Sequence, residues 1–407
     1  MDFKKLNIAT GWLVFVVATW TYVTTIEPTA SFWDCGEFLA TANKLQVGHP
    51  PGAPLFMILG RIASAFVSTE NVPVAINILS ALSSSFTILF LFWSITHMAK
   101  KLATRDTDEP MTTGQLIAVL GSGIVGSLAY TWSDSFWFSA VEAEVYSMSS
   151  FFTAITFWTI LKWESEAHEP HNTRWLILIC YLLGLSIGVQ LLGLLCIPAI
   201  ALVYYFKKFK TTTTGVVYAL VISALILGTI QSVIIPGVAK VAGWFELRFV
   251  NDFGLPFNTG NLVYGALVVG LTVWGLMWTQ RNGKVILNTI ILGVAVILFG
   301  YSTYAMTVIR SLANPPIDEN NPENVFNLVS YLNREQYGDR PLLMGQFWES
   351  PYADEREDGN PVYTATYQIK KNDRVVKNVY DKWSAQHFVE ENPGHTVDHA
   401  YIITDAR

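Results

Sequence analysis

Long apolar runs separated by short polar connections dominate the first three quarters of the chain. They cover about residues 8–26, 72–99, 113–131, 147–162, 175–206, 215–235, 262–279 and 285–309. A helix that crosses a bilayer needs about 20 mostly apolar residues. The pattern therefore predicts an all-α polytopic membrane protein over residues 1–309. The first run follows Lys4 and Lys5, but its length and Pro28 favour a membrane span over a cleaved signal peptide.

The apolar run at 175–206 is too long for a single span, since an α-helix rises about 1.5 Å per residue. Residues that break a helix or allow close packing lie inside it: Gly184, Gly188, Gly193 and Pro198. We expect two short, closely packed helices joined by a tight turn. The predicted transmembrane bundle then has about nine helices.

Lysine and arginine are distributed unevenly between the two sides of this map. Most belong to connections that are cytoplasmic if the N-terminus is: Lys4, Lys5, Lys100, Lys101, Arg105, Lys162, Arg174, Lys207, Lys208, Lys210, Arg281 and Lys284. The opposite connections carry Lys44, Arg61, Lys240 and Arg248. Because positive residues concentrate in cytoplasmic loops, we predict a cytoplasmic N-terminus and an outer location for everything after Arg310.

Residues 310–407 differ in composition from the rest of the chain. They are polar and charged, with short apolar alternations such as PVYTATYQI, which is typical of a strand. We expect an extracytoplasmic soluble α/β segment after the transmembrane domain. It has no clear terminating element, which indicates a fragment of a longer protein.

Composition supports this map and argues against some functions. The chain is 51% apolar and 14% charged, which is less polar than a soluble domain requires. Its net charge of −6 gives no support to nucleic-acid binding. Cys35, Cys180 and Cys196 lack the spacing of a metal or redox site, so we interpret them as small hydrophobic residues outside any disulfide.

The first outer connection, SFWDCGEFLATANKLQVGHPPGAPLF, carries Asp34 and Glu37 among aromatic and aliphatic residues. The pattern predicts a helix over 31–47 and a second short helix over 53–67, both at the membrane surface. The two acids share a helix face. Carboxylates at a lipid boundary cost free energy unless hydrated or paired, so they indicate a general base with a supporting acid. Solvated loop acids are the alternative.

Further candidate residues for substrate binding lie in the same outer connections. His49 precedes a rigid diproline corner and is able to hydrogen-bond a ligand. In the second outer loop, Glu142, Glu144 and Tyr146 directly precede an apolar run. The two glutamates share a face only if that piece is extended. Three cations are candidates for a phosphate or for the lipid headgroups: Lys44, Arg61 and Arg310.

Three stretches carry a resemblance to a known family: WDCGEFLATANKLQVGHPPGAPLF, FWFSAVEAEVYSMS and NPPIDENNPENVFNLVSYLNREQYGDRPLL. Together they resemble a bacterial family of uncharacterised membrane proteins. That family is similar to an animal protein O-mannosyltransferase, and both look like members of the C-type glycosyltransferase superfamily. The resemblance implies a fold of this superfamily, with amphipathic helices in the first outer loop. It also implies a bacterial inner-membrane protein whose active site faces the periplasm.

The resemblance further implies a polyprenyl-phosphate sugar donor and an inverting transfer of a sugar, mannose in the animal relative. Asp34 would be the base, with Glu37 beside it, and the acceptor would be a protein Ser or Thr or a glycolipid. Lys44, Arg61 or Arg310 would stabilise the departing lipid phosphate. Phosphate is a good leaving group, so no metal or other cofactor is required. Many members have adjacent Asp and Glu, whereas Cys35 and Gly36 intervene here, so which acid is the base stays open.

A transporter or flippase for a lipid-linked or polar solute is the alternative function. Such a protein needs polar or broken spans that meet near the middle of the bilayer. Apart from Gln190 and the glycines near it, the apolar runs carry few such residues. The acids cluster on one predicted face, which favours the enzyme.

Overall fold

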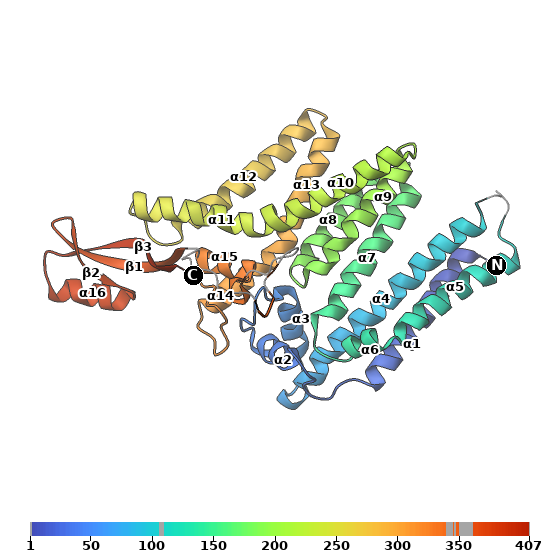
Figure 1. Ribbon diagram of the computed structural model, residues 1–407, viewed down its shortest axis with the longest axis horizontal. Coiled ribbons are helices and arrows are strands. Elements are labelled where there is room, and N and C mark those ends of the chain that lie inside the picture. Colours follow the sequence, from blue (N-terminus) through green and yellow to red (C-terminus); the bar gives the residue numbers. More distant parts are fainter. Residues whose placement is uncertain (1, 106–109, 339–344, 346, 350–360, 407) are drawn as a thin grey trace. The chain divides into compact units, whose positions relative to one another are not determined.

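The computed structural model describes residues 2–105, 110–338, 345, 347–349 and 361–406 (Figure 1). The chain forms two compact units. The first contains Met1–Ile230 and Thr279–Glu319, and the second contains Gln231–Trp278 and Asn320–Arg407. The predicted division at residues 309 and 310 follows composition and stays a prediction.

Four long helices form one side of the first unit: α1 (Phe3–Thr24), α4 (Val72–Ala103), α5 (Thr113–Thr131) and α7 (Val145–Glu166). Local sequence explains where two of them begin. Asp2 accepts a hydrogen bond from the backbone N–H of Lys4 at the start of α1. Thr112 and Gln115 form a capping box that begins α5. Apolar and small hydroxyl side chains fill the space between these helices.

The apolar run at 175–206 breaks as predicted, between α8 (Thr173–Ile187) and the 3₁₀ turn η2 (Leu191–Cys196), which leads into α9 (Ile197–Lys208). The close packing has a different partner from the one expected. A side chain at Gly184 would collide with the backbone of α13 (Val285–Tyr301), and one at Gly300 would collide with the backbone of α8. Backbone therefore meets backbone between α8 and α13.

Among the described residues, seven helical segments are long and apolar enough to cross a membrane. They are Phe3–Thr24, Thr69–Ala103, Thr113–Thr131, Leu191–Lys208, Thr213–Asp252, Thr259–Arg281 and Val285–Ser311. The prediction of about nine is not confirmed. α8 has 15 residues, fewer than a full span needs. The seven segments are typical of a polytopic membrane protein. In the segment Thr213–Asp252, α10 (Thr213–Thr229) and α11 (Ile235–Leu247) are joined by the π-turn η3 (Ile230–Ile234).

Two short helices confirm the elements predicted for the first outer connection. α2 (Cys35–Lys44) and α3 (Pro54–Ser64) contact each other and the first part of α4. Proline at the start of α3 fits the first helical turn, where its missing N–H is not needed. Smaller turns and helices complete this unit: η1 (Thr69–Asn71), α6 (Asp134–Ala140), η5 (Ser302–Tyr304) and α14 (Ala305–Ser311).

The second unit combines helices with a small antiparallel sheet of order β2-β1-β3. Its strands are β1 (Pro361–Lys371), β2 (Arg374–Val379) and β3 (Thr396–Ala406), and β1 confirms the strand predicted from PVYTATYQI. Ile369 and Val379 pack with Ala385 of α16 (Lys382–Glu391). The other elements in or adjoining this unit are α11, η4 (Arg248–Asp252), α12 (Thr259–Arg281), α15 (Val325–Asn333) and η6 (Glu335–Tyr337).

Candidate functional site

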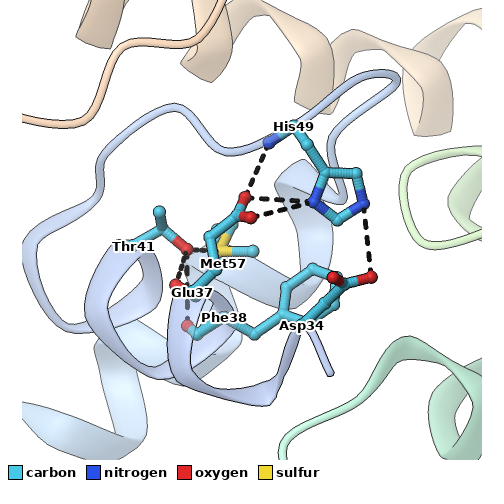
Figure 2. A network of polar contacts seen from close by, with 6 residues as sticks. All are labelled: Asp34, Glu37, Phe38, Thr41, His49 and Met57. Atoms are coloured by element: carbon cyan, nitrogen blue, oxygen red, sulfur yellow. Dashed lines mark hydrogen bonds and ion pairs between the residues drawn. The ribbon is translucent and has the colours of Figure 1, made fainter. Parts of the chain in front are cut away.

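The two acids of the first outer connection lie at the beginning of α2 (Figure 2). Asp34 occupies the N-cap position, but its side chain makes no capping hydrogen bond. It is 59% exposed, and its Oδ2 lies 3.9 Å from Nε2 of His49. Glu37, in the first turn, is closer to the histidine: both carboxylate oxygens lie 3.1 Å from Nδ1 of His49. His49 therefore lies between the two acids.

The backbone of the corner holds His49 in this position. Its own N–H donates to Oε1 of Glu37 at 2.7 Å, and its carbonyl accepts from the N–H of Gly52 at 2.8 Å. Gly52 has a φ of 68°, which favours glycine. A Cβ at Gly48 would collide with the Glu37 carboxylate, so a side chain at this position would have to displace that carboxylate.

The environment shifts the pKa values of Glu37 and His49 in opposite directions. Burial by itself would raise the pKa of Glu37, but hydrogen bonds from the His49 ring and backbone outweigh it and lower the pKa. The hydrogen bond to Glu37 raises the pKa of His49 against the opposing effect of burial, and the negative charges of Asp34 and Glu319 add to the rise. The pair is suited to hold an imidazolium beside Asp34.

The second acid-bearing loop lies next to the start of α2. Ala143 belongs to the same buried cluster as Cys35, the first residue of α2. Glu142 and Glu144 are 4% and 6% exposed, and Oε2 of Glu142 has no hydrogen-bond partner among the described residues. Burial raises the pKa of Glu142, and a hydrogen bond with Ser31 opposes the rise.

Glu144 forms the N-cap of α7 and accepts a hydrogen bond from the N–H of Val145 at 3.0 Å. Burial raises its pKa to about 7 despite this hydrogen bond. The negative charges of Asp34 and Glu142 raise the pKa further, whereas His49 lowers it. The structure thus brings Glu144 into the electrostatic field of the first loop. Its carboxyl group is suited to donate a hydrogen bond near neutral pH.

Tyr146 lies in the first turn of α7 with 49% of its surface exposed. The residues just before α7 are not helical, and Glu144 is extended with φ −133° and ψ 150°. Glu142 and Tyr146 are therefore not neighbours on one face of a helix. Residues 141–143 form bends, and the N–H of Glu144 donates to the carbonyl of Glu142 at 2.9 Å, so the piece is a turn and not the extended segment in which the two glutamates would share a face.

The three candidate cations gather at the other end of α2. Lys44 lies in its last turn, and Arg61 donates to the carbonyl of Asn43 at 2.6 Å. Arg310 donates from Nε to the carbonyl of Leu45 at 2.5 Å. These arginines satisfy carbonyls at the negative end of the helix. Ten residues of helix separate Asp34 from Lys44, about 15 Å along the axis, so the cations do not join the acids.

Two acids near His49 were missed by reasoning from the sequence. Residues 317–319 run beside Val47, whose N–H donates to the carbonyl of Ile317 at 3.1 Å. Asp318 accepts a hydrogen bond from Ser311 at 2.9 Å, and burial raises its pKa. Glu319 contributes to the raised pKa of His49. Their signal was the run PPIDEN shortly after α14, which was interpreted as part of the tail and of a family motif but not as a source of site residues.

The described residues contain no group of three or more His, Cys, Asp or Glu side chains that could hold a metal ion. The site consists of carboxylates, one imidazole and backbone groups at the ends of α2, α7 and α14. Such a set can accept a proton, donate a hydrogen bond and offer one cation to a phosphate.

Comparison with known proteins agrees with the resemblance seen in the motifs. Residues 34–213 match the model of the "Protein O-mannosyl-transferase TMEM260 N-terminal domain". Protein O-mannosyl-transferase tmem260 of Dictyostelium discoideum is 29% identical over 154 residues, which are 37% of this chain and 17% of that protein. The mouse (Mus musculus) protein is 23% identical over 202 residues, which are 49% of this chain and 26% of that protein.

No solved structure matches this chain. The chain is thus related to the protein O-mannosyl-transferases of the TMEM260 type, and the alignments span about a sixth to a quarter of those proteins. The region matched by the family model begins at Asp34 and contains both acid-bearing loops, whereas the whole of the second unit lies outside it.

Proposed function

We propose that this chain is a membrane glycosyltransferase of the C-type superfamily. It transfers mannose from a polyprenyl-phosphate donor to an acceptor hydroxyl, that of a protein Ser or Thr. The observation that carries the proposal is the exposed Asp34, 3.9 Å from a histidine that Glu37 holds by its ring and backbone. This arrangement lies inside the region related to named O-mannosyl-transferases, which supplies the sugar and the type of acceptor.

Asp34 acts as the general base in this mechanism. Its carboxylate takes the proton from the acceptor hydroxyl while the hydroxyl oxygen forms a bond to the anomeric carbon of the sugar. The bond between that carbon and the phosphate oxygen breaks on the opposite face, and the lipid phosphate leaves with the bonding electrons. The configuration at the anomeric carbon is inverted. The exposure of Asp34 supports this role, because a base must be open to its substrate.

The neighbours of Asp34 hold the donor. The imidazolium of His49, held by Glu37, stabilises the negative charge that grows on the departing phosphate. Glu144, whose pKa is raised to about 7, donates a hydrogen bond to the sugar, and Glu142 binds the sugar beside it. Tyr146 is exposed beside them and contacts the sugar or the acceptor.

Lys44, Arg61 and Arg310 receive a different part in the proposal. They lie about 15 Å from Asp34 along α2, and both arginines already bind carbonyl groups at the end of this helix. They fix the helix and meet lipid headgroups at the surface. We place this site on the periplasmic face of a bacterial inner membrane, in line with the distribution of lysine and arginine.

The test compares three variants of the purified chain in nanodiscs, with labelled polyprenyl-phosphate mannose and acceptor peptides that contain Ser and Thr. Asp34→Asn keeps the size of the side chain but cannot accept the proton. We expect sugar transfer to fall by about two to four orders of magnitude while the donor still binds. Glu37→Gln should reduce transfer less, because it weakens only the support of His49.

Asp134→Asn is the matched control, since Asp134 is an exposed acid in the first turn of α6. It should transfer sugar at the rate of the unmodified chain. Near-normal transfer by Asp34→Asn combined with loss in Glu37→Gln would assign the base to the other acid. Movement of the donor across the membrane without any transfer would favour the flippase.

A further inference from the structure

A polar cavity lies far from the acids. It has a volume of about 610 Å³ and is bordered by the N-terminal end of α1 and the C-terminal ends of α4 and α7. Four lysines from these three helices line it: Lys4, Lys100, Lys101 and Lys162. The proposed transfer reaction uses none of them.

In Figure 1, α2 and α3 lie near the start of α4, whereas the N-terminus, where α1 begins, lies near the other end of α4. The cavity and the acids are therefore separated by the length of α4. Ile76, near the start of α4, packs in the same cluster as α2 and α3. His97, which lines the cavity, lies about 32 Å further along the helix. This distance is about the thickness of the hydrocarbon core of a bilayer. The cavity therefore lies at the predicted cytoplasmic face when the acids lie at the outer face.

Positive charge exceeds negative charge among the described residues around the cavity. Glu164 pairs with Lys101 and lies 3.6 Å from His97. No carboxylate of the described part of the chain forms an ion pair with the other three lysines. The acids Asp106, Asp108 and Glu109 follow α4 and lie outside the described residues. A basic cavity between transmembrane helices at the cytoplasmic face is typical of a site for anionic headgroups.

The walls of the cavity provide more than charge. The rings of Trp93 and Trp158 lie 5.8 Å apart, and the Lys162 ammonium lies 5.2 Å from the centre of the Trp158 ring. Oδ1 of Asn7 is buried without a hydrogen-bond partner among the described residues. It is an acceptor suited to a hydroxyl group. If these lysines only extended their ammonium groups into water, they would need neither a cavity nor a buried hydrogen-bond acceptor beside them.

We propose that this cavity binds the headgroup of an anionic glycerophospholipid. The phosphate diester lies among Lys4, Lys100 and Lys162, and a headgroup hydroxyl donates to Asn7. The tryptophans lie at the level of the glycerol backbone, as interfacial tryptophans do. The site is separate from the proposed transfer reaction, so its test does not depend on that reaction.

Native mass spectrometry of the full chain in a neutral detergent measures lipid binding and so tests the site. Three ligands are compared at equal concentration: phosphatidylglycerol, phosphatidylcholine and soluble glycerol phosphate. We expect phosphatidylglycerol to bind about tenfold more tightly than phosphatidylcholine, and the preference to weaken as salt is added. Glycerol phosphate should bind weakly, because it lacks the acyl chains. Equal binding of the two lipids would overturn the proposal, as would binding of glycerol phosphate alone.

Two double variants locate the site. Lys100→Gln with Lys162→Gln should abolish the preference for phosphatidylglycerol, whereas Lys100→Arg with Lys162→Arg should keep it. Lys5→Gln with Lys210→Gln removes the same charge from the same predicted face outside the cavity, so it should also keep the preference. If the control pair loses the preference as fully as the cavity pair, the lysines act through net charge and the site does not exist. The comparison of lipids on the unmodified chain tests the proposal even if a variant fails to fold.

Discussion

Glu37 and Glu144 have the same side chain, but their pKa values differ because their surroundings differ. Glu37 is hydrogen-bonded to His49, and its pKa is lowered although the residue is half-buried. Glu144 is buried near other negative charges, and its pKa is raised to about 7. At neutral pH one glutamate is an ionised support and the other retains a proton for much of the time. Environments that separate pKa values in this way commonly assign different roles to acids in an active site.

The raised pKa of Glu144 predicts that stability depends on pH. The folded chain keeps a proton on Glu144 that the unfolded chain releases near its ordinary pKa of 4.5. The resulting contribution to stability is fully present below pH 4.5 and is lost as the pH rises through about 7. Glu144→Gln removes this titration. The thermal midpoint of the unmodified chain should therefore fall relative to that of Glu144→Gln as the pH is raised from 5 to 7.5. The difference between the two midpoints should change by a few degrees in favour of the variant.

Thermal unfolding followed by intrinsic fluorescence in one detergent measures this difference. Glu70→Gln is the control, because Glu70 is an exposed acid in η1 and its replacement should leave the pH dependence unchanged. A constant difference between Glu144→Gln and the unmodified chain across this pH range would show that Glu144 does not titrate there.

Sequence analysis found the acids of both loops, because short polar stretches beside apolar runs are visible in a linear pattern. The partner of Glu37 was not predicted, although His49 was a candidate for ligand binding. Their contact depends on the backbone of the corner, because the N–H of His49 donates to the Glu37 carboxylate in addition to the contact with its ring. Asp318 was also missed, because it reaches this region only through the pairing of residues 317–319 with Val47.

At the scale of elements, α2 separates two kinds of chemistry along its length. Its first turn carries the acids, and its last turn is bound by arginines from α3 and α14. Helix-forming residues at 31–47 and the position of the second stretch after the diproline predicted α2 and α3. It did not predict where Arg310 would bind, because 265 residues separate it from Leu45 in the sequence.

The corner between α2 and α3 should not tolerate a side chain at Gly48. The Cβ of Gly48→Ala would collide with the Glu37 carboxylate and displace it from His49. We expect sugar transfer to fall about 10- to 100-fold, the usual effect of a small misplacement in an active site. Gly121→Ala in α5 is the matched control, since no atom lies within 4 Å of the Cβ that it adds. Equal activities of the two variants would contradict the role assigned to the corner.

At the scale of the whole molecule, the alternation of long apolar helices was predictable, whereas their number was not. α8 is mostly apolar after Arg174 but has only 15 residues, since the helix breaks before Gln190. A hydropathy pattern identifies apolar length and cannot tell a span from a shorter helix packed against other helices. The close contact of α8 with α13 was also hidden, because a sequence names the glycines but not their neighbours.

The predicted orientation places the C-terminal segment outside the cytoplasm. A cysteine at Gln386, an exposed position in α16, should react with a membrane-impermeant thiol reagent added to intact cells. The native cysteines are buried or half-buried, so the unmodified chain should react little. Ser350, another position in this segment, lies outside the described residues. Labelling of Gln386→Cys only after the cells are opened would reverse the predicted topology.

The arginines that bind the end of α2 have a consequence for the order in which the protein is made. A ribosome releases α2 and both acid-bearing loops long before it reaches Arg310 and the segment that pairs with Val47. During this interval the nascent chain contains Asp34, Glu37 and Glu144, yet one of the two arginines that bind α2 is missing. The mature geometry is therefore reached late in synthesis, when α14 has left the ribosome and docked onto a helix that is already in the membrane.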